Sequence, residues 1–308
     1  MRPAVEISGL SKRYRRVEAL RGIDMVVPTH SVFGFLGPNG AGKTTTMKIL
    51  MGLIRPTSGA AYVLGRDVRD GTAVRAKIGY LPQSPSFYEK ARLAEMLAFV
   101  ARRFMKGSRR AVATRVSETL EMVGLADKAD RRVKALSGGE LRRLGIAQAY
   151  VGHPELLILD EPSVGLDPEG RRDVLDLIES LREHATVLFS THILDDVQRV
   201  ADHIAVLDQG ELVAQGSIAE FLTSGAVAYR IGFAGDGDVA IKALETEPWI
   251  ASIRSLSPSA WSVEATDQRE AERRLARCLA TSGGTVTEIR PEQRSLEDIY
   301  LEIVGNGS

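Results

Sequence analysis

The residues with the clearest chemical potential form a glycine-rich stretch near the start of the chain. Residues 37–45 read Gly-Pro-Asn-Gly-Ala-Gly-Lys-Thr-Thr and meet the pattern G-x-x-x-x-G-K-[ST] at Gly37, Gly42, Lys43 and Thr44. Glycines let successive backbone N–H groups turn inward around an anion, and a helix start adds unpaired donors and partial positive charge. The stretch therefore predicts a phosphate-binding loop, in which Lys43 neutralises phosphates and the Thr44 hydroxyl coordinates Mg²⁺.

The sequence on either side of this loop supplies the context that the motif requires. The apolar run Ser31–Leu36 is typical of a buried strand, and residues 46–51 have the helical spacing of apolar side chains. A chance match in a glycine-rich chain is the alternative, and both flanks count against it. We therefore expect the whole loop to bind nucleotide phosphates, through Gly37, Pro38, Asn39, Gly40, Ala41, Gly42, Lys43, Thr44 and Thr45.

An acidic pair follows another predicted strand much further along the chain. Leu156–Leu159 is four consecutive aliphatic residues, as in a strand buried on both faces of a parallel sheet, and Asp160 and Glu161 come directly after it. Asp160 is predicted to hold Mg²⁺, and Glu161 to accept a proton from, or orient, an attacking water. An isolated Asp-Glu pair is usually a surface turn, but the aliphatic run and the phosphate loop favour hydrolysis.

The elements that must position these groups alternate between strands and helices. That order predicts an α/β fold with a mainly parallel, helix-covered sheet, in which ligands bind at the carboxyl ends of the strands. The phosphate loop and the acidic pair both follow such strands, and His192 follows the predicted strand Thr186–Ser190. These groups are therefore expected to meet at one edge of the sheet.

Two further parts of the N-terminal region are predicted beside this core. Short strands at 5–8, 25–28 and 60–64 indicate an antiparallel β-subdomain, with a polar turn region around 12–20 that contains Tyr14. Between about 84 and 150 the chain predicts an inserted helical subdomain, because apolar residues recur at helical spacing in 91–105, 109–123 and 141–151.

The C-terminal part has a different character, and we place the two domains at 1–222 and 226–308. Its predicted element order, β-α-β-β-α-β, resembles a split ferredoxin-like α+β unit, followed by an amphipathic helix at 295–304. This part contains no cluster of catalytic residue types. We expect an accessory domain that serves interaction or dimer stabilisation.

Composition narrows the class of protein. The 308 residues include 40 basic and 40 acidic side chains, and this balance counts against nucleic acid as a partner. The single cysteine, Cys278, excludes an internal disulfide and a cysteine metal cluster and fits a reducing compartment. The N-terminus has no apolar signal core, and no uncharged apolar run reaches the roughly 18 residues of a membrane span, so we expect none.

These motifs, taken with Leu136-Ser137-Gly138-Gly139-Glu140, resemble the nucleotide-binding subunit of ATP-binding-cassette (ABC) transporters. The resemblance covers roughly residues 5–221, and residues 136–140 match a family signature that other phosphate-loop ATPases lack. Ser137 and two glycines before a helix also form a second anion-binding helix start. In the family the signature of one subunit completes the ATP site of another. The resemblance therefore implies two ATP molecules buried between two chains arranged head to tail.

The resemblance also implies roles for individual residues. Tyr14 matches the aromatic that stacks on adenine, and Gln83 matches the glutamine that contacts Mg²⁺ and the attacking water. Asp167 matches the aspartate of a loop that crosses the dimer, and His192 matches the switch histidine that reaches the γ-phosphate. The implied catalytic residues are Lys43, Gln83, Glu161 and His192; the implied nucleotide contacts are Tyr14, residues 37–45, Ser137, Gly138, Gly139 and Asp167; the implied Mg²⁺ ligands are Thr44, Gln83 and Asp160.

One residue of the signature departs from the family pattern. Its fifth position is Glu140, where the family more commonly has glutamine. We expect this change to weaken a ribose contact or alter affinity, and to leave the phosphate contacts of Ser137 and Gly139 in place.

The resemblance implies an ATPase that uses ATP and Mg²⁺ and powers a separate integral membrane permease. Its other partner would be a second copy or a paralogous ATPase subunit, on the cytoplasmic face of the membrane. The segment from Ser295 to Leu301 resembles the drug and antibiotic exporter branch. The alternative is a soluble ABC ATPase acting on nucleic acid or ribosomes; such proteins commonly have two cassettes or long coiled coils, and this chain has one cassette and no sustained heptads. The signature argues against a phosphate-loop kinase or GTPase.

Overall fold

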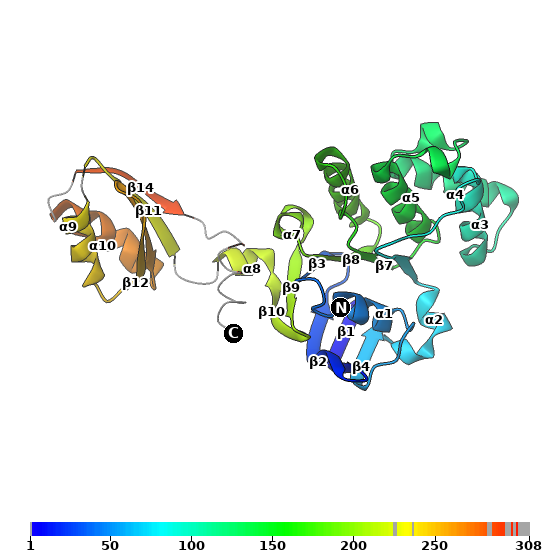
Figure 1. The fold of residues 1–308 in the computed structure, drawn as a ribbon, viewed down its shortest axis with the longest axis horizontal. Helices are drawn as coiled ribbons and strands as arrows, with labels where there is room; N and C mark the ends of the chain where they lie inside the picture. Colours follow the sequence, from blue (N-terminus) through cyan, green and yellow to red (C-terminus); the bar gives the residue numbers. More distant parts are fainter. Residues whose placement is uncertain are drawn as a thin grey trace. The chain divides into compact units, whose positions relative to one another are not determined.

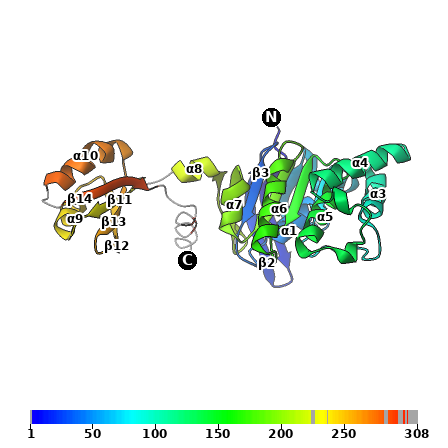
Figure 2. The same cartoon turned by 90° about the horizontal axis from the view of Figure 1, so that it is seen from above.

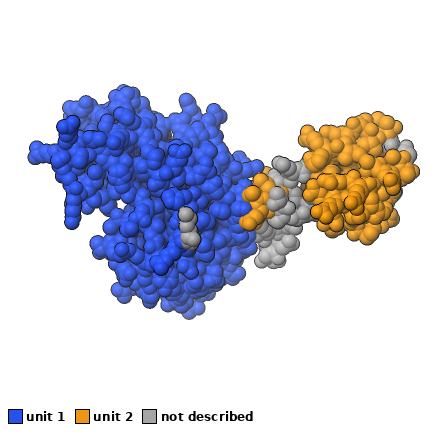
Figure 3. All heavy atoms as spheres, turned by 180° about the vertical axis from the view of Figure 1, so that it is seen from behind, with its two compact units in different colours: residues 1–218 blue, residues 219–308 orange. Residues whose placement is uncertain are grey.

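The computed structural model describes residues 2–223, 227–235, 237–281, 285–292, 297 and 300. Contacts between Cα atoms divide the chain into two units, residues 1–218 and residues 219–308 (Figure 3). Each unit has its own sheet system and its own apolar core. The predicted last helix, 295–304, lies almost entirely outside the described residues.

The first unit is built on a six-stranded sheet. In spatial order its strands are β10 (Glu211–Ser217), β9 (His203–Asp208), β3 (Val32–Leu36), β8 (Thr186–Thr191), β7 (Leu156–Asp160) and β6 (Ile78–Leu81). All neighbours pair in parallel except β10 with β9. Every residue of β3, β7 and β8 is buried, which is why these strands are continuous apolar runs. The predicted α/β class is confirmed.

The register of the parallel strands brings their ends to one edge. Leu36 of β3 pairs with Thr191 of β8, and Asp160 of β7 pairs with Ser190 of β8. The chain leaves the sheet at the same level after each of these strands. The phosphate loop, the acidic pair and His192 therefore meet at the carboxyl edge, as the sequence predicted.

A second, antiparallel sheet packs against the opposite side of α1 (Lys43–Leu50). Its strands are β2 (Val17–Val27), β1 (Val5–Tyr14), β4 (Ser58–Val63) and β5 (Arg66–Asp67). One apolar core joins both sheets through Met47, Ile49 and Leu50 of α1 (Figure 1). The phosphate-loop helix is thus enclosed between two sheets, which fixes the direction in which its N-terminus points.

The predicted turn region around 12–20 is wrong. Strands β1 and β2 continue through it, with Lys12 opposite Leu20 and Tyr14 opposite Val17, so that only residues 15 and 16 form the turn. Arg15 has a φ of 48°, which lets the chain reverse within two residues. The polar residues there lie on exposed positions of a twisted hairpin, and their backbone groups pair across it. Tyr14 is the last residue of a strand instead of a loop residue.

The inserted helical part contains α3 (Leu93–Phe104), α4 (Arg109–Met122) and α5 (Gly138–Tyr150), which lie together in both views (Figures 1 and 2). Between α4 and α5 the chain forms two short 3-10 turns, Ala126–Lys128 and Val133–Ala135. Helix α5 contacts β6 and β7, which ties the helical part to the central sheet. The remaining helices of the first unit are α2 (Thr72–Arg75), α6 (Pro168–Leu181) and α7 (Leu194–Val200), and α8 (Ile218–Thr223) begins at its end.

The described part of the second unit contains a four-stranded antiparallel sheet that packs with helices α9 (Asp238–Glu245) and α10 (Gln268–Thr281). The strand order is β12 (Ile250–Ser257), β13 (Ala260–Ala265), β11 (Val227–Phe233) and β14 (Val286–Glu292). Helices α9 and α10 share one core with side chains of these strands, including Trp249 and Trp261. The sequential order β-α-β-β-α-β is that of the predicted ferredoxin-like unit.

Candidate active site

The phosphate loop joins β3 to α1 in a conformation that only glycine tolerates at two positions. Gly42 caps the helix with a φ of 113°. A Cβ on Gly37 would lie 2.2 Å from the carbonyl oxygen of Leu207 in the neighbouring strand β9. The loop is therefore pressed against the sheet, and the N-terminus of α1 opens toward the ligand side.

Lys43 is buried at the centre of the loop, with 5% of its surface exposed. Its Nζ donates to the carbonyl oxygens of Gly37, at 2.6 Å, and Pro38, at 3.1 Å. The same Nζ lies 3.3 Å from Oε1 of Glu161. The ammonium is thus held in place by backbone acceptors while it remains beside a carboxylate, an arrangement in which a phosphate oxygen can also bind.

Thr44 and Asp160 face each other across the site. The Thr44 hydroxyl donates to the Asp160 carboxylate, with Oγ1 at 2.9 Å from Oδ2 and 3.2 Å from Oδ1. Asp160 is 1% exposed. A hydroxyl and a carboxylate oxygen this close are hard ligands suited to Mg²⁺, which takes one or two protein ligands and completes its shell with water and phosphate. No group of three or more acidic, His or Cys side chains suited to a metal occurs among the described residues.

Glu161 connects the lysine to the histidine. Its Oε2 lies 3.1 Å from Nδ1 of His192, while Oε1 faces Lys43. Glu161 has a φ of 51°, which is uncommon for a residue other than glycine and is found at functional sites. If the carboxylate is ionised, Nδ1 of His192 carries the proton and Nε2 is the free nitrogen. The carboxylate is therefore placed to accept a proton, and the histidine is held by it.

A cavity of about 380 Å³ opens in front of these groups. Both the phosphate loop and the acidic edge contribute to its wall, which consists of Ala19, Asn39, Gly40, Ala41, Gly42, Lys43, Thr44, Thr45, Gln83 and Glu161. The structure thus brings together most of the predicted loop residues with two predicted catalytic residues, Gln83 and Glu161. Asp160 and His192 join them through the hydrogen bonds described above.

The signature residues lie elsewhere. Ser137 caps α5 with a reciprocal capping box: its Oγ accepts the Glu140 N–H at 3.3 Å, and its own N–H donates to Glu140 Oε2 at 2.8 Å. Gly139 lies against the start of α6, since a Cβ built on it would be 3.5 Å from Gly170 Cα. Asp167 is the N-cap of α6. None of Ser137, Gly138, Gly139 or Asp167 lines the cavity at the phosphate loop.

Tyr14 also lies outside the cavity wall. Its ring is 43% exposed and has Lys12 Nζ 4.9 Å from its centroid. Ala19, on the paired strand β2, does line the cavity. The hairpin therefore reaches the site through β2, and Tyr14 presents a free aromatic face near its tip.

Sequence reasoning missed three residues that organise the site. Ser190 donates to Asp160 Oδ1 at 2.6 Å and accepts from the Glu161 N–H at 2.9 Å, so it positions both acids. Arg142 of α5 donates to the carbonyl oxygens of Gln83, at 3.2 Å, and Val164, at 3.3 Å. Asp196, fully buried, binds Arg171 at 2.6 Å and also Ser163. Only Ser190 had a sequence signal, since it ends the strand before His192.

Burial changes the pKa of two side chains around the site. Burial, with a further contribution from the Asp160 charge, raises the pKa of Tyr80 to about 12, so this phenol stays neutral beside the acid. Burial lowers the pKa of Arg142, and the negative charge of Glu161 partly opposes this. Arg142 and Glu161 are thus close enough to influence each other electrostatically.

A phosphate loop, a paired hydroxyl and carboxylate for a metal, and a buried glutamate at the carboxyl edge of a parallel sheet define a phosphate-loop nucleoside triphosphatase. The ABC transporter family model matches residues 20–164. An ABC transporter ATP-binding protein of Bacillus subtilis is 38% identical over 97% of this chain and 99% of its own length. The chain belongs to the ABC transporter family, as its ATP-binding and ATP-hydrolysing subunit.

Further comparisons agree. The daunorubicin/doxorubicin resistance ATP-binding protein of Streptomyces peucetius is 38% identical over 98% of this chain and 93% of its own length. The structure of cbiO1 from Clostridium perfringens, part of the ABC transporter complex cbiONQ, is 27% identical, with a TM-score of 0.68 over 80% of this chain and 97% of that one. A dimeric cassette bound to ADP and Pi has the same fold, with a TM-score of 0.63 over 70% of this chain and 98% of that one at 24% identity.

Proposed function

We propose that this chain energises an exporter: it hydrolyses ATP and drives a separate membrane permease. Two full-length relatives support the direction of transport. The full-length relatives include the drug resistance protein of Streptomyces peucetius and a Nod factor export ATP-binding protein of Ralstonia nicotianae, 32% identical over 98% of this chain and 94% of its own length. No helix in the described part of the chain is long and apolar enough to cross a membrane.

In the proposed mechanism of hydrolysis each buried group has one role. The main observation that supports this mechanism is the contact of Glu161 with both Lys43 and His192. Lys43 and the backbone N–H groups of residues 42–45, at the start of α1, bind the β- and γ-phosphates. Glu161 accepts the proton of the attacking water, and His192, held through Nδ1, donates an Nε2–H to a γ-phosphate oxygen when both ring nitrogens carry hydrogen. Gln83 helps to orient that water from the cavity wall.

Thr44 and Asp160 would hold Mg²⁺, with Gln83 as a further ligand. When bound, the ion neutralises the charge that develops on the phosphate oxygens. Ser190 keeps the Asp160 carboxylate turned toward Thr44 through its 2.6 Å hydrogen bond. Because the same hydroxyl accepts the backbone N–H of Glu161, it also fixes the spacing between the metal ligand and the proposed base.

We propose further that the ATP site is completed by a second copy or a paralogous subunit. Ser137, Gly138 and Gly139 form a second anion-binding helix start at α5, and Asp167 caps the neighbouring α6, yet none of the four lines the cavity of its own chain. One phosphate loop and one signature per chain then make two sites in a head-to-tail pair. The triphosphate charge is neutralised fully only when both surfaces close on it, which converts binding energy into movement. Tyr14 would stack on the adenine from the hairpin tip.

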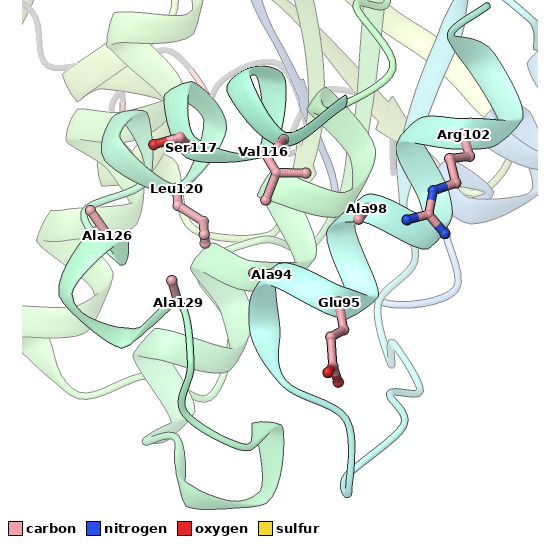
Figure 4. A pocket seen from close by; sticks show the side chains of 10 residues that line it. Ala94, Glu95, Ala98, Arg102, Val116, Ser117, Leu120, Ala126 and Ala129 are labelled. Carbon is pink, nitrogen blue, oxygen red and sulfur yellow. The ribbon is translucent and has the colours of Figure 1, made fainter. Parts of the chain in front are cut away.

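The permease would bind the helical part. A cavity of about 460 Å³ lies between α3 and α4, and its wall is largely apolar with Glu95 and Arg102 at its edge (Figure 4). Residues 84–104 also contain Tyr88, 84% exposed, and Phe99, 61% exposed. Contiguous apolar surface marks protein contacts, and the proposed docking surface consists of these two aromatics together with the apolar cavity. Binding through this region would hold the chain at the cytoplasmic face of the membrane. The alternative, a soluble ABC ATPase that acts on nucleic acid or ribosomes, is not favoured by the relatives reported above, which are named for export and drug resistance.

Mixing two inactive variants tests the shared site. Lys43→Ala disables the phosphate loop, and Gly139→Asp places a negative charge at the signature, where a Cβ meets only ordinary contacts. Each variant alone should be inactive. A mixed pair contains one site with an intact loop and an intact signature, so activity should return to about a quarter of wild type, from one site in half of the pairs. If mixtures stay inactive although the chains pair, the shared site is wrong.

Glu161→Gln tests the base. It should lower turnover by about 10²–10⁴ while ATP still binds, and it should accumulate the ATP-bound pair. An unchanged turnover rate would contradict the assignment. Pull-down of the permease by wild type but not by a Tyr88→Ser/Phe99→Ser variant would test the docking surface, with Tyr62→Ser, an exposed aromatic of β4, as the matched control.

A further inference from the structure

A lysine outside every motif contacts the unusual residue of the signature. Lys128 Nζ lies 2.6 Å from Oε1 of Glu140, and the two side chains are only 22% and 14% exposed. The other oxygen of Glu140, Oε2, accepts the backbone N–H of Ser137 at 2.8 Å. Both oxygens of the carboxylate are therefore engaged, one with a cation and one with the signature backbone.

The Glu140 carboxylate lies at the N-terminal end of α5, where the proposed function places a phosphate of the nucleotide. The first N–H groups of a helix have no partner within it, and the capping box uses only the Glu140 N–H and the N–H of the cap residue Ser137. The N–H groups of Gly138 and Gly139, and the hydroxyl hydrogen of Ser137, are left to face a phosphate. A negative charge on Glu140, within one turn of these donors, would repel that phosphate. A glutamine at this position would not.

The surroundings of Lys128 hold its ammonium near Glu140. Its backbone is fixed in the 3-10 turn between α4 and α5: its N–H donates to Leu125 at 3.0 Å, and its carbonyl accepts from Arg131 at 2.8 Å. The only other carboxylate near Nζ among the described residues is Asp127, at 3.8 Å and largely exposed. The hydrogen bond from Lys128, followed by that from the Ser137 N–H, lowers the pKa of Glu140, which keeps this side chain charged at neutral pH.

We infer that Lys128 is a positioning residue of the ATPase: it neutralises Glu140 and holds it on Ser137, so that a signature with a carboxylate still accepts the triphosphate of the partner subunit. The inference rests on the proposed function, in which the signature binds the nucleotide of the opposite chain. It also explains how the chain tolerates glutamate in place of glutamine. In this inference Lys128 and Glu140 act together, although Lys128 lies in the 3-10 turn after α4 and Glu140 in the first turn of α5.

The test measures ATP-driven pairing in a Glu161→Gln background, which suppresses turnover, as a function of ATP concentration. Lys128→Met leaves an uncompensated carboxylate and should weaken the apparent ATP affinity for pairing roughly tenfold. Glu140→Gln leaves Lys128 with unbalanced positive charge and should strengthen it about two- to threefold. The double variant removes both charges and should return to within about threefold of the Glu161→Gln parent.

Three further measurements separate this role from a general loss of structure. Lys128→Arg should retain pairing, and the matched exposed variant Lys106→Met should leave it unchanged. ATP binding to the isolated monomer should be unaffected by Lys128→Met, because the phosphate loop is elsewhere. The Lys128→Met defect should shrink as salt rises, since screening weakens charge repulsion. Lys128→Met could also lower the melting temperature. In that case the higher apparent ATP affinity expected for Glu140→Gln alone still tests whether a negative charge at residue 140 opposes ATP-driven pairing.

The outcomes distinguish the inference from the function on which it rests. If the parent pairs with ATP but Lys128→Met pairs equally well, or if its defect persists in the Lys128→Met/Glu140→Gln double variant, the inference is overturned and the proposed function stands. If the wild-type chain neither hydrolyses ATP nor pairs with it, the proposed function fails and this inference fails with it.

Discussion

Lys43 and Glu161 form an ion pair of 3.3 Å in which both side chains are at least nine-tenths buried. The lysine belongs to the phosphate loop, and the glutamate follows β7 and contacts His192 with its other oxygen. One carboxylate therefore links Lys43, the proposed phosphate-binding group, to His192, the proposed contact of the γ-phosphate. In the proposed mechanism a phosphate that approaches Lys43 competes with Glu161 for the same ammonium, and this competition frees the carboxylate for the attacking water.

The pair predicts a strong coupling in stability. Lys43→Met leaves Glu161 buried without its ion-pair partner, and removing one partner of a buried pair costs about 3–5 kcal/mol. Adding Glu161→Gln should recover more than half of that loss, because no uncompensated charge remains. Urea unfolding without nucleotide measures this. Circular dichroism is needed because both tryptophans, Trp249 and Trp261, belong to the second unit. Additive losses would show that the pair is not coupled.

Ser190 predicts a change in metal dependence. Ser190→Ala removes the hydrogen bond to Asp160 and the acceptor for the Glu161 N–H. Loss of an outer contact to a metal ligand typically costs about 10–100-fold in metal affinity or activity. We expect the Mg²⁺ concentration for half-maximal ATPase activity to rise at least about tenfold. Ser180→Ala, which removes a hydroxyl bound only to its own helix at Leu177, should change nothing.

Arg142 predicts a link between the signature helix and the catalytic edge. Arg142→Ala removes two hydrogen bonds that join α5 to the carbonyl oxygens of Gln83 and Val164. We expect kcat to fall roughly tenfold, since each hydrogen bond to a charged group contributes about 1.5–3 kcal/mol, part of which water replaces. ATP affinity of the monomer should be unchanged. Arg109→Ala, on an exposed helix start, is the control; equal effects in both variants would remove the proposed link.

Cys278 predicts a thiol that reacts at higher pH than usual. Burial first, and then the charge and hydrogen bond of Glu247, raise the pKa of the Cys278 thiol. A raised pKa means less thiolate at a given pH, so the rate of reaction with a disulfide reagent should rise at higher pH than in the urea-unfolded chain. Glu247→Gln should speed the reaction at pH 8 by a few-fold. A rate profile identical to that of the unfolded chain would contradict this prediction.

The sequence alone determined the parts of the site that depend on local chain conformation. The phosphate loop needs glycine where φ is positive and where β9 approaches, and Gly42 and Gly37 meet these needs within one short motif. The aliphatic runs before Asp160 and His192 identified buried parallel strands, whose common edge follows from topology. Prediction from the sequence failed where the pattern of apolar and polar residues was weak. Residues 12–20 form a hairpin with many exposed polar side chains, and such a sequence resembles a polar turn.

Only the tertiary structure decided which distant side chains meet. Ser190 reaches Asp160 because β8 and β7 pair in one particular register, and Arg142 reaches Gln83 because α5 packs on β6. The partner of Glu140 was equally hidden, since nothing in the sequence distinguishes Lys128 from the other eight lysines, and only the turn after α4 brings it within 2.6 Å. A local motif consists of residues that are close in the sequence and can be recognised there. These contacts instead depend on strand register and helix packing, which are determined by interactions throughout the chain.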